Sequence, residues 1–224
     1  MAGDNRAEQT RAAWLGVLEK HRHDFDGPGS EEYWSPKLDT ASRDELTAIQ
    51  NDKLALVTPF LYENSPFYRA RFDRLGLAPT DIASVDDLPK WPVLDKSEMM
   101  EDAAANPPYG TYTTIDDDAW QKRGWMLFSS SGSTGVPRVF RYTHVDREYW
   151  EWSNARAMWA MDIRPGDVML PISGFGPHVF VWGATVAADR LGLAVIPGGG
   201  MDAKARAGII ERFNPTVIAC TPSY

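Results

Sequence analysis

A run of small hydroxyl and glycine residues, 129 to 135, has the composition that best suits ligand chemistry in this chain. Its hydroxyls could donate hydrogen bonds to phosphate oxygens, and its glycines would let backbone N–H groups approach a phosphate closely. Arg138 and Arg141 follow and add positive charge in a chain whose formal net charge is −8. The run lacks the glycine spacing and the lysine of a Walker loop. A Ser/Gly stretch is usually a flexible surface loop, so composition alone gives only a candidate phosphate site.

Strand-like apolar runs flank this loop on both sides. Residues 125–128 read Trp-Met-Leu-Phe and residues 139–142 read Val-Phe-Arg-Tyr, which predicts a strand–loop–strand unit. Thr143 is placed to cap a helix that runs to about Met161. The tryptophans of that helix (Trp150, Trp152 and Trp159) are expected to be packing residues.

Three short apolar runs follow the turn at 164–167, and they alternate with two amphipathic segments. The order is strand at 168–172, helix at 179–191, strand at 193–196, helix at 202–213 and strand at 216–220. This alternation predicts right-handed crossovers and a parallel sheet.

The loops after these predicted strands are the natural place for a ligand. Ligands of open α/β sheets bind outside the carboxyl ends of the strands. Three segments meet that criterion, residues 173–177, 198–200 and 221–224.

The first part of the chain reads as helical. Ser42 and Glu45 have the spacing of a capping box, and apolar residues then recur at helical intervals. A turn-rich break at 106–110 suggests a boundary between a mainly helical region, 1–105, and an α/β region, 106–224. The expected fold class is therefore α/β, a helical region followed by the strand–loop–strand and a βαβαβ unit.

Charge and cysteine content exclude several functions. The net charge of −8 without a basic cluster argues against binding to nucleic acid or to an anionic membrane. Cys220 is the only cysteine and is expected to be buried in a strand; four scattered histidines give no metal-ligand spacing. No signal peptide or membrane-spanning run is seen, so a cytoplasmic location is expected.

The order of residues in the loop is more specific than its composition. The loop resembles the Ser-Ser/Thr-Gly-Thr-Thr-Gly-x-Pro-Lys signature of the adenylate-forming superfamily, which includes acyl- and aryl-coenzyme A ligases. The matching residues are Ser130, Ser131, Gly132, Ser133, Thr134, Gly135, Val136, Pro137 and Arg138. Serine replaces one threonine and arginine replaces the final lysine, so the hydroxyl and the charge are both kept.

Other segments resemble the N-terminal part of phenylacetate–coenzyme A ligases in particular. The resemblance runs from about Tyr33 to the last residue. It is carried by residues 33–38, 65–69, 86–89, 164–167 and 215–224. The chain is therefore expected to be part of the large N-terminal domain of an adenylate-forming enzyme.

This resemblance implies an acid–thiol ligase that uses ATP, Mg²⁺ and coenzyme A. Ser130, Ser131, Gly132, Ser133, Thr134, Gly135 and Arg138 would bind the ATP phosphates. By position, Phe175 and His178 match aromatic residues that line the family's acyl pocket. His178 stands where the phenylacetate enzymes usually carry phenylalanine, so a small aromatic acid with a polar substituent is the expected substrate.

Family members are longer than 224 residues, and their catalytic lysine and their adenine and magnesium contacts lie beyond the matching part. No catalytic or metal-binding residue is assigned here, and the 224-residue chain is expected to be inactive alone. Two alternatives stay open, a non-catalytic nucleotide- or acyl-binding remnant and an adenylating enzyme that loads a carrier protein. A homodimer is also left open.

Overall fold

The computed structural model describes residues 2–130 and 138–221, and the chain forms two compact units. Unit 1 comprises Met1–His23, Thr40–Lys122 and Thr134–Arg141, and unit 2 comprises Asp24–Asp39, Arg123–Ser133 and Tyr142–Tyr224. The boundary expected between residues 105 and 106 stays a prediction.

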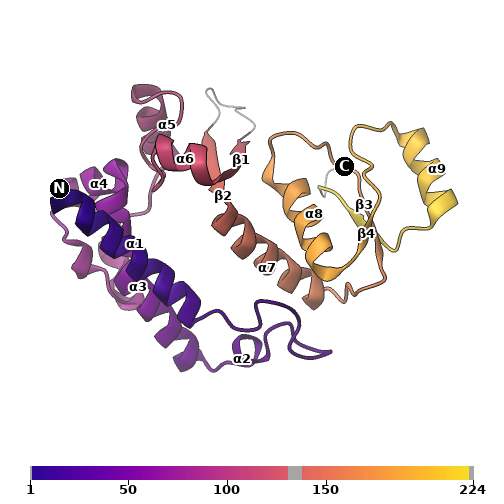
Figure 1. The fold of residues 1–224 in the computed structure, drawn as a ribbon, viewed down its shortest axis with the longest axis horizontal. Coiled ribbons are helices and arrows are strands. Elements are labelled where there is room, and N and C mark those ends of the chain that lie inside the picture. Colours follow the sequence, from indigo (N-terminus) through magenta and orange to yellow (C-terminus); the bar gives the residue numbers. More distant parts are fainter. Residues whose placement is uncertain (1, 131–137, 222–224) are drawn as a thin grey trace. The chain divides into compact units, whose positions relative to one another are not determined.

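Unit 1 is built from helices. They are α1 (Ala2–Lys20), α3 (Arg43–Asn64), α4 (Pro66–Leu75), η1 (Pro79–Asp81), η2 (Val85–Lys90), α5 (Lys96–Ala105) and most of α6 (Asp117–Arg123). Helix α1 runs along α3 (Figure 1). The predicted capping box is confirmed, because Ser42 accepts a hydrogen bond from Glu45 N while the Glu45 carboxylate accepts one from Ser42 N.

Two buried arginines of unit 1 bind fixed partners inside that unit. Arg71 donates to Glu98 and to the carbonyl oxygen of Pro92 at 2.6 Å. Arg141 has a side chain only 4% exposed and donates to Asp117 at 2.5 Å. Its guanidinium also donates to the Ile115 carbonyl, so Arg141 is bound within unit 1, and its expected contribution of charge to the loop stays a prediction.

Unit 2 holds the strands and three longer helices. Its elements are α2 (Pro36–Asp39), β1 (Gly124–Ser129), the end of β2 (Val139–Thr143), α7 (His144–Ala160), β3 (Val168–Pro171), α8 (Val179–Leu191), β4 (Ala194–Val195), α9 (Ala203–Phe213) and β5 (Val217–Ala219). Strands β1 and β2 belong to a two-stranded sheet, and Thr143 caps α7 as predicted.

The parallel sheet has the order β4–β3–β5, and this confirms the predicted α/β class. Strand β3 is central, so the chain crosses the sheet in one direction through α8 and in the other through α9. Right-handed crossovers in opposite directions place the two helices on opposite sides of the strands (Figure 1). The carboxyl end of β3 thus lies where the strand order reverses, which is the usual ligand position in such sheets.

The core of unit 2 lies between α7, α8 and β3. It buries Trp34, Trp159, Met169 and Ala187 among other apolar residues. Helix α8 approaches α7 closely at Gly183, where an added Cβ would lie 2.7 Å from the Trp150 ring. The expected packing role of the α7 tryptophans is therefore confirmed.

Cys220 differs from its prediction. It follows β5 rather than lying within it, and its side chain is half-buried and free. Within β5 itself, Ile218 is 50% exposed. The apolar pattern identified the strand, but the pattern alone does not tell how deeply each residue of a strand is buried.

Candidate functional site

The end of β1, where the predicted phosphate loop begins, lies against the loop between β3 and α8, which carries Phe175 and His178. The amide of Ser129 donates to the carbonyl oxygen of Pro177 at 2.8 Å. Ser130 follows and is half-buried. The other residues of the predicted phosphate site before Arg138 (Ser131, Gly132, Ser133, Thr134 and Gly135) lie outside the described residues. Their role in phosphate binding stays a prediction.

Arg138 immediately precedes β2 and belongs to unit 1. Its guanidinium carbon lies 5.9 Å from the centre of the Phe140 ring, and the residue is half-buried. The Tyr112 hydroxyl donates to the carbonyl oxygen of Val139 at 2.7 Å and fixes the backbone beside it. The charged side chain of Arg138 therefore extends from the residue before a strand whose backbone is fixed by Tyr112, which is compatible with the predicted phosphate contact.

The predicted acyl segment, residues 174–180, comprises most of the loop between β3 and α8 and the first two residues of α8. Phe175 packs edge-on against Trp182, with 5.4 Å between ring centres. On its other side it meets Gly199, where an added Cβ would lie 2.5 Å from the Phe175 ring. The ring of Phe175 is thus held between α8 and the loop after β4.

His178 occupies the N-cap position of α8, but its side chain makes no capping hydrogen bond. The residue is exposed, and its ring lies over Gly176, where an added Cβ would be 3.4 Å from the His178 Cδ2 atom. Among the described residues its imidazole has no hydrogen-bond partner. Both ring nitrogens therefore remain available to a polar group on a ligand.

The loops after the three parallel strands lie together at the carboxyl ends of the strands, as predicted. The amide of Gly198 donates to the Pro171 carbonyl at 3.1 Å, and the amide of Thr221 donates to the Ser173 hydroxyl at 3.4 Å. Gly198 is buried, and Arg206 of α9 donates to its carbonyl oxygen at 3.2 Å. The described parts of these loops form one contiguous surface at the carboxyl end of β3.

The turn at 164–167 lies at the opposite end of β3 and fixes where the strand begins. The Asp167 carboxylate accepts hydrogen bonds from Arg164 N at 2.8 Å and from the Thr216 hydroxyl at 2.7 Å. These bonds, that from Arg164 N first, lower the pKa of Asp167 below its ordinary value because they stabilise the carboxylate. Since Thr216 precedes β5, Asp167 joins the starts of β3 and β5 and fixes their register.

Sequence reasoning missed one residue of this site, Trp182, whereas Gly199 lies in the loop 198–200 that was expected to face a ligand. The indole N–H of Trp182 donates to the carbonyl oxygen of Gly176 at 2.9 Å. The amphipathic pattern of residues 179–191 predicts the helix but not this contact. A bulky aromatic residue in the first turn of the helix was the one available signal for Trp182.

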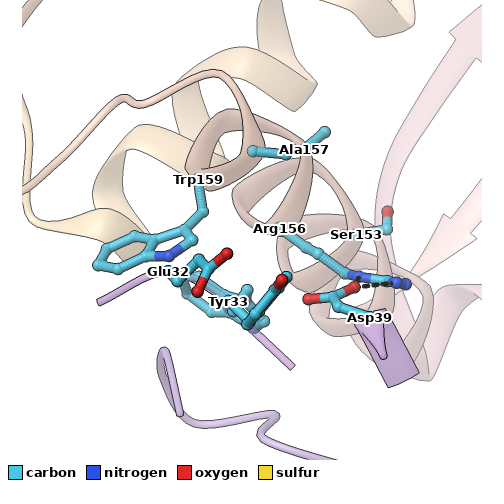
Figure 2. Close-up of a pocket in the computed structure, with 9 residues that line it drawn as sticks. Glu32, Tyr33, Asp39, Ser153, Arg156, Ala157 and Trp159 are labelled. Carbon is cyan, nitrogen blue, oxygen red and sulfur yellow. Dashed lines mark hydrogen bonds and ion pairs between the residues drawn. The ribbon is translucent and has the colours of Figure 1, made fainter. Parts of the chain in front are cut away.

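A separate cavity of about 530 Å³ lies between residues 32–39 and α7 (Figure 2). It is lined by Glu32, Tyr33, Trp34, Asp39, Ser153, Arg156, Ala157, Trp159 and Ala160. In Figure 2 the Arg156 guanidinium reaches the Asp39 carboxylate, and its Nε atom donates at 2.8 Å. Interaction with the neighbouring Glu32 carboxylate raises the pKa of Tyr33 above its ordinary value, because the carboxylate favours the protonated hydroxyl. Asp39 and Arg156 thus form an ion pair within this cavity.

Two features of the described residues bear on function class. None of their helices combines the length and the apolar character needed to cross a membrane. Over the same part of the chain, no three His, Cys, Asp or Glu side chains gather as the ligands of a metal ion would.

Comparisons with known proteins give a consistent result. No family model matches the chain. It is 35% identical to the phenylacetate–coenzyme A ligase of Escherichia coli (strain K12) over 187 residues, which cover 84% of this chain and 41% of that protein. It is 31% identical to the phenylacetate–coenzyme A ligase of Thermus thermophilus over 191 residues, 85% of this chain and 41% of the relative.

A solved structure is similar in fold as well as in sequence. It is a 2-hydroxyisobutyryl-CoA ligase in complex with 2-HIB-AMP and CoA, with a TM-score of 0.79 and 29% identity. The match covers 88% of this chain and 41% of that one. The chain therefore spans about two-fifths of the length of these relatives, 41% in each case, and matches their N-terminal portion.

Proposed function

We propose that this chain, which corresponds to the N-terminal portion of the phenylacetate–coenzyme A ligases of the adenylate-forming superfamily, binds ATP and a carboxylic acid for adenylation. In the reaction of the complete enzyme, a carboxylate oxygen attacks the α-phosphorus of ATP and pyrophosphate leaves. The thiol of coenzyme A then attacks the acyl-adenylate carbonyl, and AMP leaves. Ser130, the loop residues that follow it, and Arg138 would hold the phosphates by hydrogen bonds and charge.

One observation carries this proposal, the hydrogen bond from Ser129 N to the Pro177 carbonyl at 2.8 Å. It joins the start of the phosphate loop to the segment that carries Phe175 and His178. An adenylating enzyme needs such proximity, because the carboxylate and the α-phosphorus must meet in one site. The position at the carboxyl end of the central strand β3 supports the same assignment.

Phe175 and His178 favour a small acid with an aromatic body and a polar substituent. The Phe175 ring offers an apolar wall, while the exposed imidazole of His178 can donate to or accept from a hydroxyl or amino group. The names of two kinds of relative support this choice, since one is a ligase of phenylacetate and the other a ligase of a hydroxylated acid, 2-hydroxyisobutyrate. We expect 4-hydroxyphenylacetate to bind more tightly than phenylacetate.

Mg²⁺ and coenzyme A complete the proposed set of cofactors and substrates. Mg²⁺ would offset the charge of the ATP phosphates, and no described residue is assigned to it. Coenzyme A is the acceptor in the proposed reaction, and the thiol of a carrier protein is the alternative.

The test uses the full-length gene product with ATP, Mg²⁺ and a panel of acids, and it measures pyrophosphate release and acyl-coenzyme A formation. The panel contains phenylacetate, 4-hydroxyphenylacetate and 2-hydroxyisobutyrate. Binding of ATP without turnover of any acid would contradict the proposed reaction and favour a nucleotide-binding remnant.

Arg138→Ala tests the phosphate site itself. Loss of a charge-assisted hydrogen bond should weaken ATP binding about tenfold or more. Arg43→Ala is the matched control, because Arg43 is an exposed arginine in the first turn of α3. Equal ATP affinity in Arg138→Ala and in the control would remove Arg138 from the site.

A further inference from the structure

The segment from Ser173 to His178 is held by its backbone, although its sequence is rich in glycine. Two consecutive carbonyl oxygens accept hydrogen bonds from two different elements. The Gly176 carbonyl accepts from the indole N–H of Trp182 in α8 at 2.9 Å, and the Pro177 carbonyl accepts from Ser129 N at 2.8 Å. A free Gly-Phe-Gly sequence would sample many conformations, so these bonds select one of them.

Trp182 makes a second contact with the same segment. Its ring meets the Phe175 ring edge-on, with 5.4 Å between centres and 80° between planes. One side chain therefore fixes both a carbonyl and an aromatic ring of the predicted acyl wall. Edge-on aromatic pairs of this kind are favourable beyond the area that they bury.

Trp182 is itself held on a rigid support. The next residue, Gly183, is the point where α8 comes closest to α7, and an added Cβ there would lie 2.7 Å from the Trp150 ring. Val181, on the other side, is 2% exposed. The packed backbone on both sides of Trp182 fixes the position from which the indole extends.

We propose that Trp182 is a positioning residue that determines the shape of the acid pocket, acting through the Gly176 carbonyl and the Phe175 ring. This inference rests on the proposed function, because it takes residues 173–178 as the acid-binding segment. Trp182 is not expected to touch ATP. Its loss should therefore change acid binding and leave nucleotide binding in place.

The experiment compares Trp182→Phe with the wild-type gene product. Phenylalanine keeps an aromatic ring in α8 but removes the N–H that binds Gly176. The matched control is Trp152→Phe, because Trp152 lies in α7 and its indole N–H is buried without a hydrogen-bond partner among the described residues. Both variants lose the same atoms, but only one loses a hydrogen bond.

Two measurements separate the outcomes. Hydrogen exchange of the Ser129 amide, which donates to the Pro177 carbonyl of this segment, should become about tenfold faster in Trp182→Phe, since one ordinary hydrogen bond corresponds to about that factor. Affinity for phenylacetate, measured with ATP present, should fall about tenfold, whereas affinity for ATP should change less than about twofold. Trp152→Phe should alter neither the local exchange nor the acid affinity.

Unchanged exchange and unchanged phenylacetate affinity in Trp182→Phe would overturn the proposal. An equal loss of ATP and acid affinity would also overturn it, because it would indicate general destabilisation. If the wild-type protein binds ATP but none of the acids, the proposed function fails for its own reason. The exchange data would then still show whether Trp182 fixes the segment.

Discussion

Two segments of unit 2 use their side chains in opposite ways. Residues 33–38 carry the family resemblance, and residues 173–178 hold Phe175 and His178, which match the family's acyl-pocket aromatics by position. The segment 33–38 packs inward, where Trp34 is 1% exposed against the α7–α8 core. The segment 173–178 has its backbone bound by Trp182 and Ser129 and leaves His178 exposed. Family resemblance alone therefore does not separate an anchor from a site; the direction of the polar groups does.

The position of each segment in the fold explains this difference. Residues 173–178 follow the central strand β3, so they lie at its carboxyl end, at the point where the strand order reverses. Residues 33–35 precede helix α2, and residues 36–38 belong to it. The helix lies beside the cavity in which Asp39 and Arg156 form an ion pair. The first segment can present groups to a ligand, while the second segment stabilises the unit.

The largest expected effect follows from removing the anchor. Trp34→Ala should lower the free energy of unfolding by about 3–5 kcal/mol, because it deletes a fully buried indole and leaves a cavity beside Trp159. Urea unfolding of the variant measures this loss. Lys37→Ala, on the same segment but exposed, should stay within about 0.5 kcal/mol of wild type. A small loss in Trp34→Ala would show that the segment is not an anchor.

The next effect concerns the close approach of two loops. Gly199→Ala should lower the free energy of unfolding by about 1–3 kcal/mol, because its Cβ would lie 2.6 Å from the Ser173 carbonyl oxygen. It should also displace Phe175 and weaken acid binding. Gly174→Ala is the control in the same region, since an added Cβ there meets nothing within 4 Å. Equal stability of the two variants would contradict the tight packing of the segment.

Much of this fold could be predicted from sequence, because its elements follow local patterns. The strand–helix alternation after residue 164 and the caps at Ser42 and Thr143 depend on residues close together in the chain. The bond from Trp182 to Gly176 also spans only six residues, yet no pattern signals it, because it depends on how α8 leaves the loop. No local pattern signals the ion pair of Arg141 either, because its partner Asp117 is 24 residues away in the chain.

A more specific effect is expected at the exposed end of the acyl segment. His178→Phe should leave the free energy of unfolding within about 0.5 kcal/mol, because the side chain is exposed and makes no cap. The preference for 4-hydroxyphenylacetate over phenylacetate should fall about tenfold, as one hydrogen bond to the substituent is lost. The ratio of the two acid affinities measures this change.

The control for that variant is His144→Phe, an exposed histidine in the first turn of α7. It should leave the ratio of acid affinities unchanged. An unchanged ratio in both variants would show that His178 does not contact the substituent. The contrast between the two segments would then rest on backbone geometry alone.

The smallest effect is expected in the cavity beside residues 33–38. Arg156→Met should lower the free energy of unfolding by no more than about 1 kcal/mol, because the arginine side chain is 36% exposed and water screens its pairing with Asp39. The double variant Arg156→Met with Asp39→Asn removes both charges and should recover part of that loss. High salt should shrink the difference between wild type and Arg156→Met, since it screens exposed charges. A loss above about 2 kcal/mol would exceed the range of exposed ion pairs and show that this pair holds the anchor in place, as Trp34 does.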